Sequence, residues 1–375
     1  MTSPTFDVVI IGAGIVGSAC AAECVSEGLK TAIVEAKIIG GGATAAGMGH
    51  LVVMDDSEAQ FALTSYSCKL WSELKEDLPP SIEYEACGTI WVAADDEEMA
   101  EVRRKEKYYT ERGVPVQVLD LKALQEAEPN LRSGLAGGLR VPNDCVIYPP
   151  CAAKFFIDRA VSNGATLILG KKVKDIQKDG VRLDDDTFLS SGLIVNAAGS
   201  WSPSLTSGID VKKRKGHLLI TDRYPGFVKH QLVELGYLKS AHSVTEDSVA
   251  FNIQPRKTGQ MLIGSSRQYG VDSSQIDTPI LTRMLNRAIE YMPRLVNLSS
   301  IRTWTGFRAA TPDKLPLIGP DVFNPRLYLA TGHEGLGITT SLGTAKLLVD
   351  QIVGRRPAIP VGPYLPARIS ELSHA

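Results

Sequence analysis

The chain has 375 residues, 44% of them hydrophobic, and this length suggests about two domains with substantial cores. It carries 40 basic and 42 acidic side chains, so its formal net charge is -2 at pH 7. We therefore expect no general electrostatic attraction to nucleic acid or to an acidic membrane. The apolar run at 8–25 includes Glu23 and three glycines, and no basic residue precedes it. A signal peptide or a membrane span is not expected there.

The first segment, residues 7–35, reads DVVIIGAGIVGSACAAECVSEGLKTAIVE. Its pattern predicts a strand at 8–11, a helix that ends by Gly28, and a second strand at 31–34 followed by Glu35. A βαβ unit of this kind binds a dinucleotide. A purely structural βαβ unit is the alternative, but the agreement of strands, helix and terminal carboxylate favours the dinucleotide.

Three glycines shape the turn before this helix. Gly12 permits a tight turn, Gly14 lets the backbone approach a pyrophosphate, and Gly17 lets the helix pack against the strands. The N–H groups at the start of the helix then face the phosphates. Glu35 is expected to accept hydrogen bonds from the adenosine ribose.

The cysteines give no sign of a disulfide framework or a structural zinc site, because none forms a CxxC pair and no histidine cluster accompanies them. We expect reduced, mostly buried thiols in a cytoplasmic protein with no bound metal. The six are Cys20, Cys24, Cys68, Cys87, Cys145 and Cys151.

The rest of the chain alternates between helical and strand patterns. The Gly- and Ala-rich segment at 38–53 is expected to pack against a ligand rather than to form a flexible loop. Up to residue 163 we expect, in order, a helix at 57–78, a strand at 84–93, a charged helix at 95–112 with a solvated face, a helix at 119–128, strand and turn at 134–146, and a helix at 149–163.

From residue 165 the pattern is mainly strands. A surface hairpin turn is expected at 184–186, and a buried strand at 193–200 runs into a turn of small residues. Antiparallel strands with a hairpin at 257–259 follow, then a helix at 282–291. The end of the chain, 327–354, predicts a strand, a glycine turn and a long helix. This order predicts that the chain leaves the nucleotide domain, forms a β-rich domain, and returns.

Six ordered blocks then identify a resemblance that covers nearly the whole chain. They are GAGIVG with Glu35, GATAAGMG, NAAGSWS, PRKTG, GFRAATPDKLPLIG and ATGHEGLGITTSLGTAKLL. Together they resemble the FAD-dependent D-amino-acid oxidase superfamily, and most closely its glycine oxidase, sarcosine oxidase and D-hydroxyproline dehydrogenase branch. The resemblance implies oxidation of a C–N bond next to a carboxylate, which gives an imine that water hydrolyses.

The resemblance also implies an α/β fold with an α+β second domain. The expected FAD-binding domain is Rossmann-like, with a mostly parallel sheet, and comprises 1–82, 142–212 and 306–375. The expected substrate-binding domain has an antiparallel sheet and comprises 83–141 and 213–305.

Matching positions imply residues that hold the cofactor. They are Gly12, Gly14, Ile15, Val16, Gly17, Glu35 and Ala36 in the βαβ unit; Ala43, Thr44, Gly47, Met48, Gly49 and His50 in the loop after it; Val173, Ala198, Gly199 and Trp201 near the middle; and Arg308, Gly332, His333, Glu334, Gly335, Leu336, Gly337 and Ile338 near the end. Backbone N–H groups at 332–337 and the N-terminus of the last helix are expected to meet the flavin pyrimidine ring.

Arg308 matches the arginine that binds the substrate carboxylate in the glycine oxidase branch. A guanidinium matches a carboxylate in a bidentate way, and a surface ion pair is the alternative for this residue. His50, His333 and Glu334 are further catalytic candidates, although a structural hydrogen-bonding role is the alternative for each histidine. Glu334 is also a candidate substrate contact. Five residues of the second domain are expected to shape the pocket: Phe251, Asn252, Gln254, Arg267 and Tyr269.

Two positions depart from the family pattern. Gly335 stands where glycine oxidase has a second arginine, so the chain looks more like the hydroxyproline dehydrogenase side. The sarcosine oxidases attach flavin through a cysteine a few residues before TPD, whereas this chain has Thr305, Gly306 and Phe307. Noncovalent FAD is therefore expected, with His50 as a remote candidate for attachment.

Three hypotheses remain open. The leading one is a flavin-dependent amine oxidase or dehydrogenase; the others are a nicotinamide-dependent dehydrogenase and a non-catalytic flavoprotein subunit of a larger complex. The substrate is expected to be a small amino acid or amine, with oxygen, a quinone or a partner protein as electron acceptor. The sequence leaves open which substrate, which acceptor, and whether the protein forms homo- or hetero-oligomers.

Overall fold

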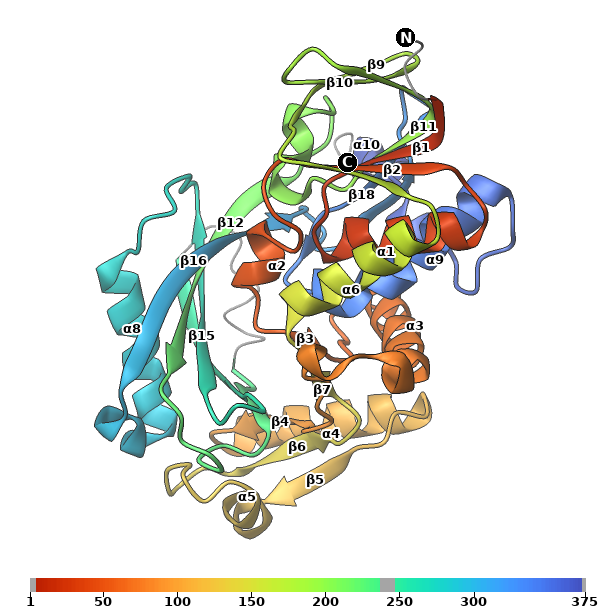
Figure 1. The fold of residues 1–375 in the computed structure, drawn as a ribbon. Coiled ribbons are helices and arrows are strands. Elements are labelled where there is room, and N and C mark those ends of the chain that lie inside the picture. The colour runs from red at the N-terminus through yellow and green to blue at the C-terminus, as the bar shows by residue number, and fades with distance from the viewer. Residues whose placement is uncertain (1–4, 237–246, 373–375) are drawn as a thin grey trace. The chain divides into compact units, whose positions relative to one another are not determined.

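The computed structural model describes residues 5–236 and 247–372, which form two compact units (Figure 1). The first unit comprises Met1–Ile82, Tyr148–Lys213 and Phe307–Ala375, and the second comprises Glu83–Ile147 and Arg214–Gly306. The predicted domain ranges include residues 1–4, 237–246 and 373–375, which lie outside the described part. The FAD-binding and substrate-binding roles of the two units stay a proposal.

The first unit is built on a mostly parallel sheet, as predicted. The strand order is β17-β18-β11-β1-β2-β8, and β1 pairs in parallel with both β2 and β11. Strands β9 and β10 extend β11 with antiparallel pairing, and β17 forms an antiparallel edge. The strands are β1 (Thr5–Ile11), β2 (Thr31–Glu35), β8 (Thr166–Leu169), β9 (Val173–Gln177), β10 (Gly180–Leu183), β11 (Phe188–Asn196), β17 (Leu317–Pro320) and β18 (Leu327–Thr331).

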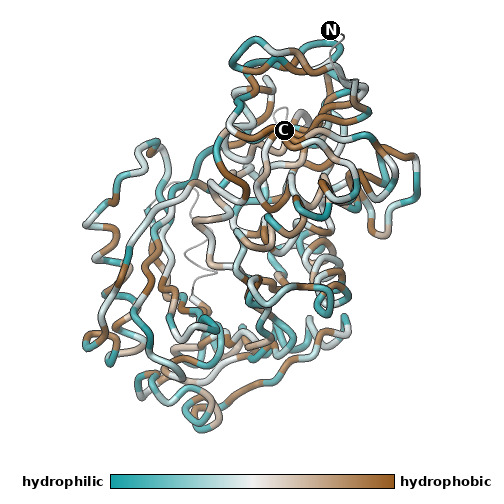
Figure 2. Tube along the Cα trace, viewed as in Figure 1, coloured by the Kyte–Doolittle hydropathy of each residue, from teal (hydrophilic) through white to brown (hydrophobic). Residues whose placement is uncertain are grey.

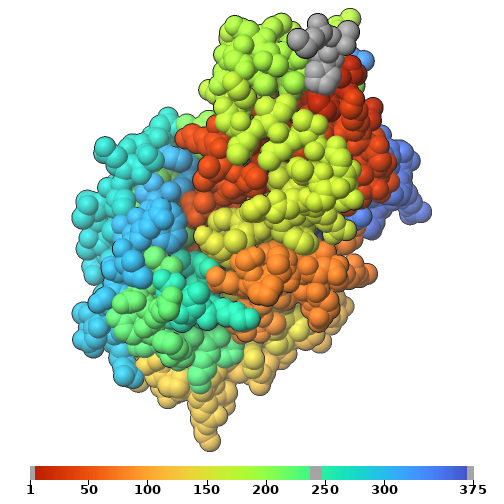
Figure 3. All heavy atoms as spheres, in the orientation of Figure 1, coloured from red at the N-terminus to blue at the C-terminus, as the bar shows by residue number. Residues whose placement is uncertain are grey.

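Helices pack against this sheet and against one another. Helix α1 lies beside α6 and α9, and the buried Trp71 of α3 donates a hydrogen bond to the Thr339 carbonyl of α9. Figure 3 shows residues of α6 and of the β9–β10 hairpin at the surface. The helices are α1 (Ile15–Ser26), α2 (Gly42–Ala46), α3 (Glu58–Leu74), α6 (Pro149–Ser162), α9 (Gly337–Val353) and α10 (Ala367–Leu372), with 3-10 turns η1 (Lys75–Asp77), η2 (Pro80–Ile82), η3 (Gly199–Ser204) and η5 (Gly362–Tyr364). Among the described helices, none is long and apolar enough to cross a bilayer.

Most predicted elements of the first unit are confirmed, with changes at their ends. Helix α3 begins after Ser57, whose side chain accepts a hydrogen bond from the Gln60 N–H, and α3 gives way to a 3-10 turn after Leu74. The hairpin turn at 184–186 joins β10 and β11 as expected. The segment at 38–53 is packed, but it contains a short helix, α2, and the two-residue strand β3 (His50–Leu51), which we did not predict.

The second unit contains a largely antiparallel sheet. The strand order of this sheet is β19-β16-β12-β15-β14-β13-β4-β6-β5, where β19 (His333–Glu334) belongs to the first unit. Strands β13 and β4 pair in parallel. Strands β12 and β16 each continue across a unit boundary. The bounds are β4 (Thr89–Ala93), β5 (Gln117–Asp120), β6 (Gly137–Val141), β7 (Cys145–Val146), β12 (Lys212–Thr221), β13 (Gln231–Glu234), β14 (Ser248–Pro255), β15 (Met261–Tyr269) and β16 (Ser300–Ala310). The hairpin at 257–259 is confirmed between β14 and β15.

Apolar side chains from one face of this sheet form the core of the second unit with α8. Figure 2 shows hydrophobic stretches along the strands of this unit. The helices are α4 (Asp96–Glu111), α5 (Leu121–Ala127), α8 (Thr278–Tyr291) and the 3-10 turn η4 (Pro293–Asn297). Helix α8 begins four residues before its predicted start, because Asp277 accepts a hydrogen bond from Ile280 N–H. Two predicted boundaries are wrong. The strand predicted at 84–93 begins only at Thr89, and Leu119, the first residue of the helix predicted at 119–128, belongs to strand β5.

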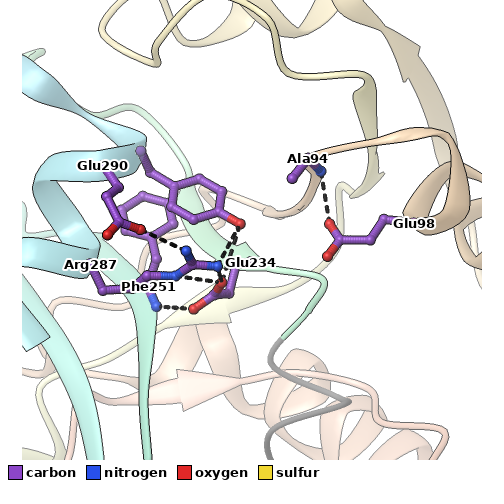
Figure 4. A network of polar contacts seen from close by, with 7 residues as sticks. Ala94, Glu98, Glu234, Phe251, Arg287 and Glu290 are labelled. Carbon is purple, nitrogen blue, oxygen red and sulfur yellow. Dashed lines mark hydrogen bonds and ion pairs between the residues drawn. The ribbon is translucent and has the colours of Figure 1, made fainter.

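The prediction that the charges of α4 form a solvated face is wrong at two positions. Lys105 is fully buried, with its Nζ 5.1 Å from the Trp91 ring centroid and 5.6 Å from that of Tyr109. Glu98 is buried two helical turns before it on the same face, and its carboxylate accepts a hydrogen bond from the Ala94 N–H (Figure 4). Helical spacing places both residues on the face that packs inward, so their charge did not indicate exposure.

A carboxylate inside the second unit holds β13, β14 and α8 together (Figure 4). Glu234 is 3% exposed and accepts hydrogen bonds from Arg287, from the Phe251 N–H and from the Tyr291 hydroxyl. The rings of Phe251 and Tyr291 stack with centroids 4.6 Å apart. Burial, followed by the negative charge of Glu234, raises the pKa of Tyr291. The hydroxyl therefore stays protonated and remains a donor.

We predict that Glu234→Ala destabilises the protein much more than Glu290→Ala. Both carboxylates contact Arg287, but Glu290 is exposed. Removing Glu234 leaves buried donors without an acceptor and should cost about 3 kcal/mol, whereas an exposed ion pair contributes about 0–1 kcal/mol. Chemical denaturation followed by tryptophan fluorescence measures the difference. Equal losses for the two variants would contradict this account of the network.

Candidate functional site

In the turn between β1 and α1, the backbone at Gly12 lies close to the backbone of Ala197 and to that of Gly17. Gly12 has φ +102°, and a Cβ there would lie 2.7 Å from the Ala197 carbonyl oxygen. A Cβ at Gly17 would overlap the carbonyl oxygen of Gly12. Gly14 has ordinary backbone angles, and a Cβ there would be 3.3 Å from the Thr44 hydroxyl. Larger residues would force the turn apart, so the roles predicted for Gly12 and Gly17 have a steric basis.

The start of α1 suits an anion. Gly14 is the N-cap, no side chain caps the helix there, and its first turn contains no acidic residue. The Ile15 N–H donates to the Thr44 hydroxyl at 3.0 Å, which ties α1 to α2. The half-buried Val16 follows. A helix N-terminus without its own acid presents N–H groups and a positive dipole end to a phosphate.

Glu35 lies at the end of β2, next to the glycine turn. One carboxylate oxygen accepts a hydrogen bond from the Ala13 N–H at 2.8 Å, and the other accepts one from the Lys37 N–H at 2.8 Å. Two main-chain donors thus hold the side chain in place. Ala36 is exposed beside it. A ribose contact by Glu35 stays a proposal.

The loop at 42–50 runs beside the first turn of α9. A Cβ at Gly47 would lie 2.8 Å from Cδ1 of Ile338, and the His50 carbonyl accepts a hydrogen bond from the Thr339 hydroxyl at 2.8 Å. Thr44, Met48 and Gly49 are buried, whereas Ala43 is exposed and His50 is half-buried. Small residues in this loop therefore allow close packing against α9.

A second helix N-terminus lies beside the first. Helix α9 begins after Leu336 without a side-chain cap, and its first turn contains no acidic residue. A Cβ at Gly337 would lie 3.8 Å from Cγ2 of Val16 in α1. A Cβ at Gly332, in the preceding turn, would lie 2.6 Å from Cγ2 of Thr311. The positive ends of α1 and α9 thus meet in the first unit, where Figure 1 shows the two helices side by side.

The turn after β11 adds polar groups and an aromatic ring. The Gly199 carbonyl accepts a hydrogen bond from the Thr331 hydroxyl at 3.0 Å, and Ala198 is half-buried. Ser200 has a buried hydroxyl with no hydrogen-bond partner among the described residues. Trp201 is 49% exposed, and a Cβ at Gly42 would lie 3.5 Å from its ring. Val173 is buried on β9.

These features fit an elongated anionic cofactor held by the first unit. The glycine turn and two uncapped helix N-termini suit a pyrophosphate and a ring that gains negative charge, while the Ser200 hydroxyl offers a hydrogen bond that the protein does not use. The family described as FAD dependent oxidoreductase, DAO, matches residues 7–351. The chain belongs to this family.

Individual relatives cover almost the whole chain. The hydrogen cyanide synthase subunit HcnC of Pseudomonas aeruginosa is 28% identical, covering 97% of this chain and 96% of the relative. Glycine oxidase of Geobacillus kaustophilus is 27% identical, covering 96% of each chain. The crystal structure of glycine oxidase from Geobacillus kaustophilus superimposes with a TM-score of 0.88, at 26% identity, over 98% of this chain and 99% of that one. The predicted fold class and the FAD requirement are confirmed.

Arg308 of this FAD-dependent oxidoreductase lies next to the α9 turn. The half-buried side chain has its Nε 3.7 Å from the point where a Cβ at Gly335 would stand. The neighbouring Ala309 pairs with Glu334 of β19 (His333–Glu334). Glu334 is half-buried and has φ +52°, a conformation that is uncommon outside glycine. The absence of a side chain at 335 leaves room beside the guanidinium.

His333 is a buried, neutral side chain. Its Nε2 lies 3.0 Å from the Thr344 hydroxyl of α9, and burial lowers its pKa to about 3. In this contact Nε2 donates or accepts the hydrogen bond according to the tautomer of the ring. A ring that stays uncharged at neutral pH suits a structural link between β19 and α9 better than the acid–base role considered for it.

The pocket candidates of the second unit divide between the two faces of its sheet. Phe251 lies in the core, stacked on Tyr291, and this placement argues against a substrate contact. Asn252 follows it and points to the opposite face. Arg267 is buried, and the half-buried Tyr269 lies with its ring centroid 4.5 Å from the Arg214 guanidinium carbon. Ser200, Thr89 and Gln231 also carry buried polar atoms, although no sequence pattern indicated these residues.

We predict that Gly17→Ala weakens FAD binding by about tenfold or more. The new methyl group would overlap the Gly12 carbonyl and displace the turn, and overpacking costs about 1–3 kcal/mol. The measurement is bound flavin per chain after gel filtration. Gly362→Ala is the matched control, because a Cβ there meets nothing within 4 Å. Full flavin content in Gly17→Ala would show that the turn can relax.

We also predict a pH dependence of stability that originates in His333. Because burial lowers its folded-state pKa to about 3, the unfolded chain binds the proton more strongly between roughly pH 3 and 6.5. The contribution of His333 is therefore complete above about pH 6.5 and decreases as the pH falls towards 3. Urea unfolding over this range should show a shallower decrease for His333→Gln. Parallel curves for the two proteins would mean that His333 is not the source.

Proposed function

We propose that the enzyme oxidises the C–N bond of a small amino acid or secondary amine that carries an α-carboxylate. Candidate substrates are of the glycine, sarcosine, D-proline, D-hydroxyproline or iminodiacetate type. The observation that carries the proposal is Arg308, whose guanidinium lies beside the uncovered Gly335 position at the approach to α9. The similarity to a glycine oxidase over 96% of each chain supports it.

The cofactor site proposed here lies in the first unit. The turn from Gly12 to Gly17 would hold the pyrophosphate, Glu35 the ribose, and the segments 43–50 and 332–338 the flavin. When bound, FAD would supply the acceptor for a hydride from the carbon next to the nitrogen, and water would hydrolyse the imine product. We propose noncovalent binding, because Thr305, Gly306 and Phe307 offer no thiol at the position of attachment in sarcosine oxidases.

The side chains of this enzyme mainly position the substrate. Arg308 would hold the carboxylate through two parallel hydrogen bonds and so fix the orientation of the α-carbon. Glu334 would pair with the substrate ammonium or with a ring hydroxyl. The neutral His333 would keep the turn at 332–337 in place through Thr344. The N-terminus of α9 would stabilise negative charge that develops near the turn.

The three earlier hypotheses now differ in their support. Membership of an FAD-dependent family argues against the hypothesis of a nicotinamide-dependent dehydrogenase. A role as one subunit of a hetero-oligomer gains support from the relative that is named a hydrogen cyanide synthase subunit. We also propose a cytoplasmic location, on the basis that all six cysteines are free thiols.

Anaerobic reduction of the purified holoenzyme tests the proposal. Oxidised flavin absorbance should bleach on addition of at least one D-amino acid or N-substituted amino acid from a panel of the types above. Repeating the active substrate with oxygen, a quinone and an artificial dye then identifies the acceptor. A chain that binds FAD but is bleached by none of these amines would be a non-catalytic subunit or an enzyme of another substrate class.

We predict that Arg308→Ala raises KM sharply and lowers kcat/KM by about 100-fold while FAD stays bound. Loss of charge-assisted hydrogen bonds to a carboxylate costs about 1.5–3 kcal/mol. Arg302→Ala is the matched control, because this arginine lies on the same strand with an exposed side chain. An unchanged KM in Arg308→Ala would remove Arg308 from the carboxylate site.

A further inference from the structure

The turn that follows β11 and the turn that follows β18 are joined by one side chain. The last paired residues of the two strands are Asn196 of β11 and Leu329 of β18. Thr331 lies further along β18, and its hydroxyl donates a hydrogen bond to the Gly199 carbonyl at 3.0 Å. The same hydroxyl accepts a hydrogen bond from the Ser202 hydroxyl at 3.0 Å. Thr331 therefore continues the connection where the backbone pairing stops.

Both turns belong to the proposed cofactor site of the first unit. The turn after β11 lies against the glycine turn, since a Cβ at Gly12 would be 2.7 Å from the Ala197 carbonyl oxygen. The turn after β18 begins at Gly332, which has φ +80°, and leads to the uncapped N-terminus of α9. Thr331 thus connects the segment proposed to hold the pyrophosphate with the segment proposed to meet the flavin.

The connection is buried, and a second side chain supports it. Thr331 is 1% exposed, and Ser202 and Asn196 are each 0% exposed. The Asn196 amide donates hydrogen bonds to the Ser202 carbonyl at 3.1 Å and to the Thr206 hydroxyl at 2.9 Å. Its side-chain oxygen accepts one from the Ala198 N–H at 3.2 Å. Because these groups are closed to solvent, a lost hydrogen bond leaves its partner unsatisfied, and the turns have to shift to recover it.

We propose that Thr331 is a positioning residue that fixes the place of the 332–337 turn and of the α9 N-terminus relative to bound FAD. The field of a helix N-terminus falls off within about one turn, so a small displacement weakens its effect on a charge. Reduced flavin carries more negative charge than oxidised flavin, so it loses more affinity when α9 moves away. The Thr331 hydroxyl thus keeps the flavin reduction potential less negative. This inference rests on the cofactor site of the proposed function.

Thr331→Val tests the proposal, because valine has nearly the shape of threonine but makes no side-chain hydrogen bond. We expect the Kd of oxidised FAD to rise about tenfold and that of reduced FAD about a hundredfold. The tenfold difference corresponds to a reduction potential about 30 mV more negative for a two-electron couple. Flavin fluorescence during titration of the apoprotein measures the Kd, and anaerobic reduction with a reference dye measures the potential.

Thr31→Val is the matched control. Thr31 is 1% exposed, and its hydroxyl donates to the Leu29 carbonyl at 2.9 Å at the start of β2, the end of the strand away from Gly12. This variant loses a comparable buried hydroxyl but should keep the Kd and the potential. Thr331→Ser retains the hydroxyl and should bring both Kd values to within about twofold of those of the unmodified protein.

Thermal midpoints report whether the variants fold. If Thr331→Val does not fold, Ser202→Ala decides, because it removes the donor to Thr331 and should change the ratio of the two Kd values about threefold in the same direction. The inference is overturned by an unchanged potential in the variant that decides. It is also overturned by an equal shift in Thr31→Val, or by a Thr331→Ser variant that behaves like Thr331→Val.

The measurements separate this inference from the proposed function, because they need FAD and a reductant but no amine. If no amine of the panel bleaches the flavin while Thr331→Val shifts the potential, only the substrate proposal fails. If amines bleach the flavin while the potential stays unchanged in Thr331→Val, only the inference about Thr331 fails.

Discussion

The contact between two stretches of backbone at the start of the chain is the constraint on which the first unit depends. Helix α1 passes so close to the Gly12 carbonyl that only a glycine fits at position 17, and Gly12 itself lies against Ala197 of the turn after β11. This contact sets the start of α1 beside the ends of β1 and β11. A dinucleotide site needs that arrangement, because its N–H groups act on a phosphate only at short range.

The opposite end of the chain completes the same site. The first turn of α9 lies next to Val16 of α1 and to the Gly47 loop, so two helix N-termini and a glycine-rich loop come together. Neither helix carries an acidic side chain in its first turn. At the proposed cofactor site, FAD would therefore meet the positive ends of two different helices.

The sequence predicted the parts that depend on local spacing. Gly12, Gly14 and Gly17 mark a turn because their separation is itself the signal, and the strand and helix periods around them agree. The sequence could not predict β13, because four residues are too few to show an alternating pattern. It could not predict the burial of Lys105 either, because a charged residue is normally expected at the surface, whereas this one packs on Trp91 and Tyr109. Phe251 was assigned to a pocket because only the position of α8 reveals which alternate residues of β14 form the core.

The division of the chain into interleaved units has a consequence for its synthesis. The last segment of the second unit ends at Gly306, whereas the first unit needs Phe307 onwards, including β18 and α9. On the ribosome the second unit can therefore close while β11 still lacks its neighbour β18 and α1 still lacks the helix α9 that packs beside it. The side of α1 that packs against α9 stays uncovered until that helix emerges. If FAD binds at the proposed site, its capture is a late event, and a nascent chain released before α9 would lack part of that site and of the first unit.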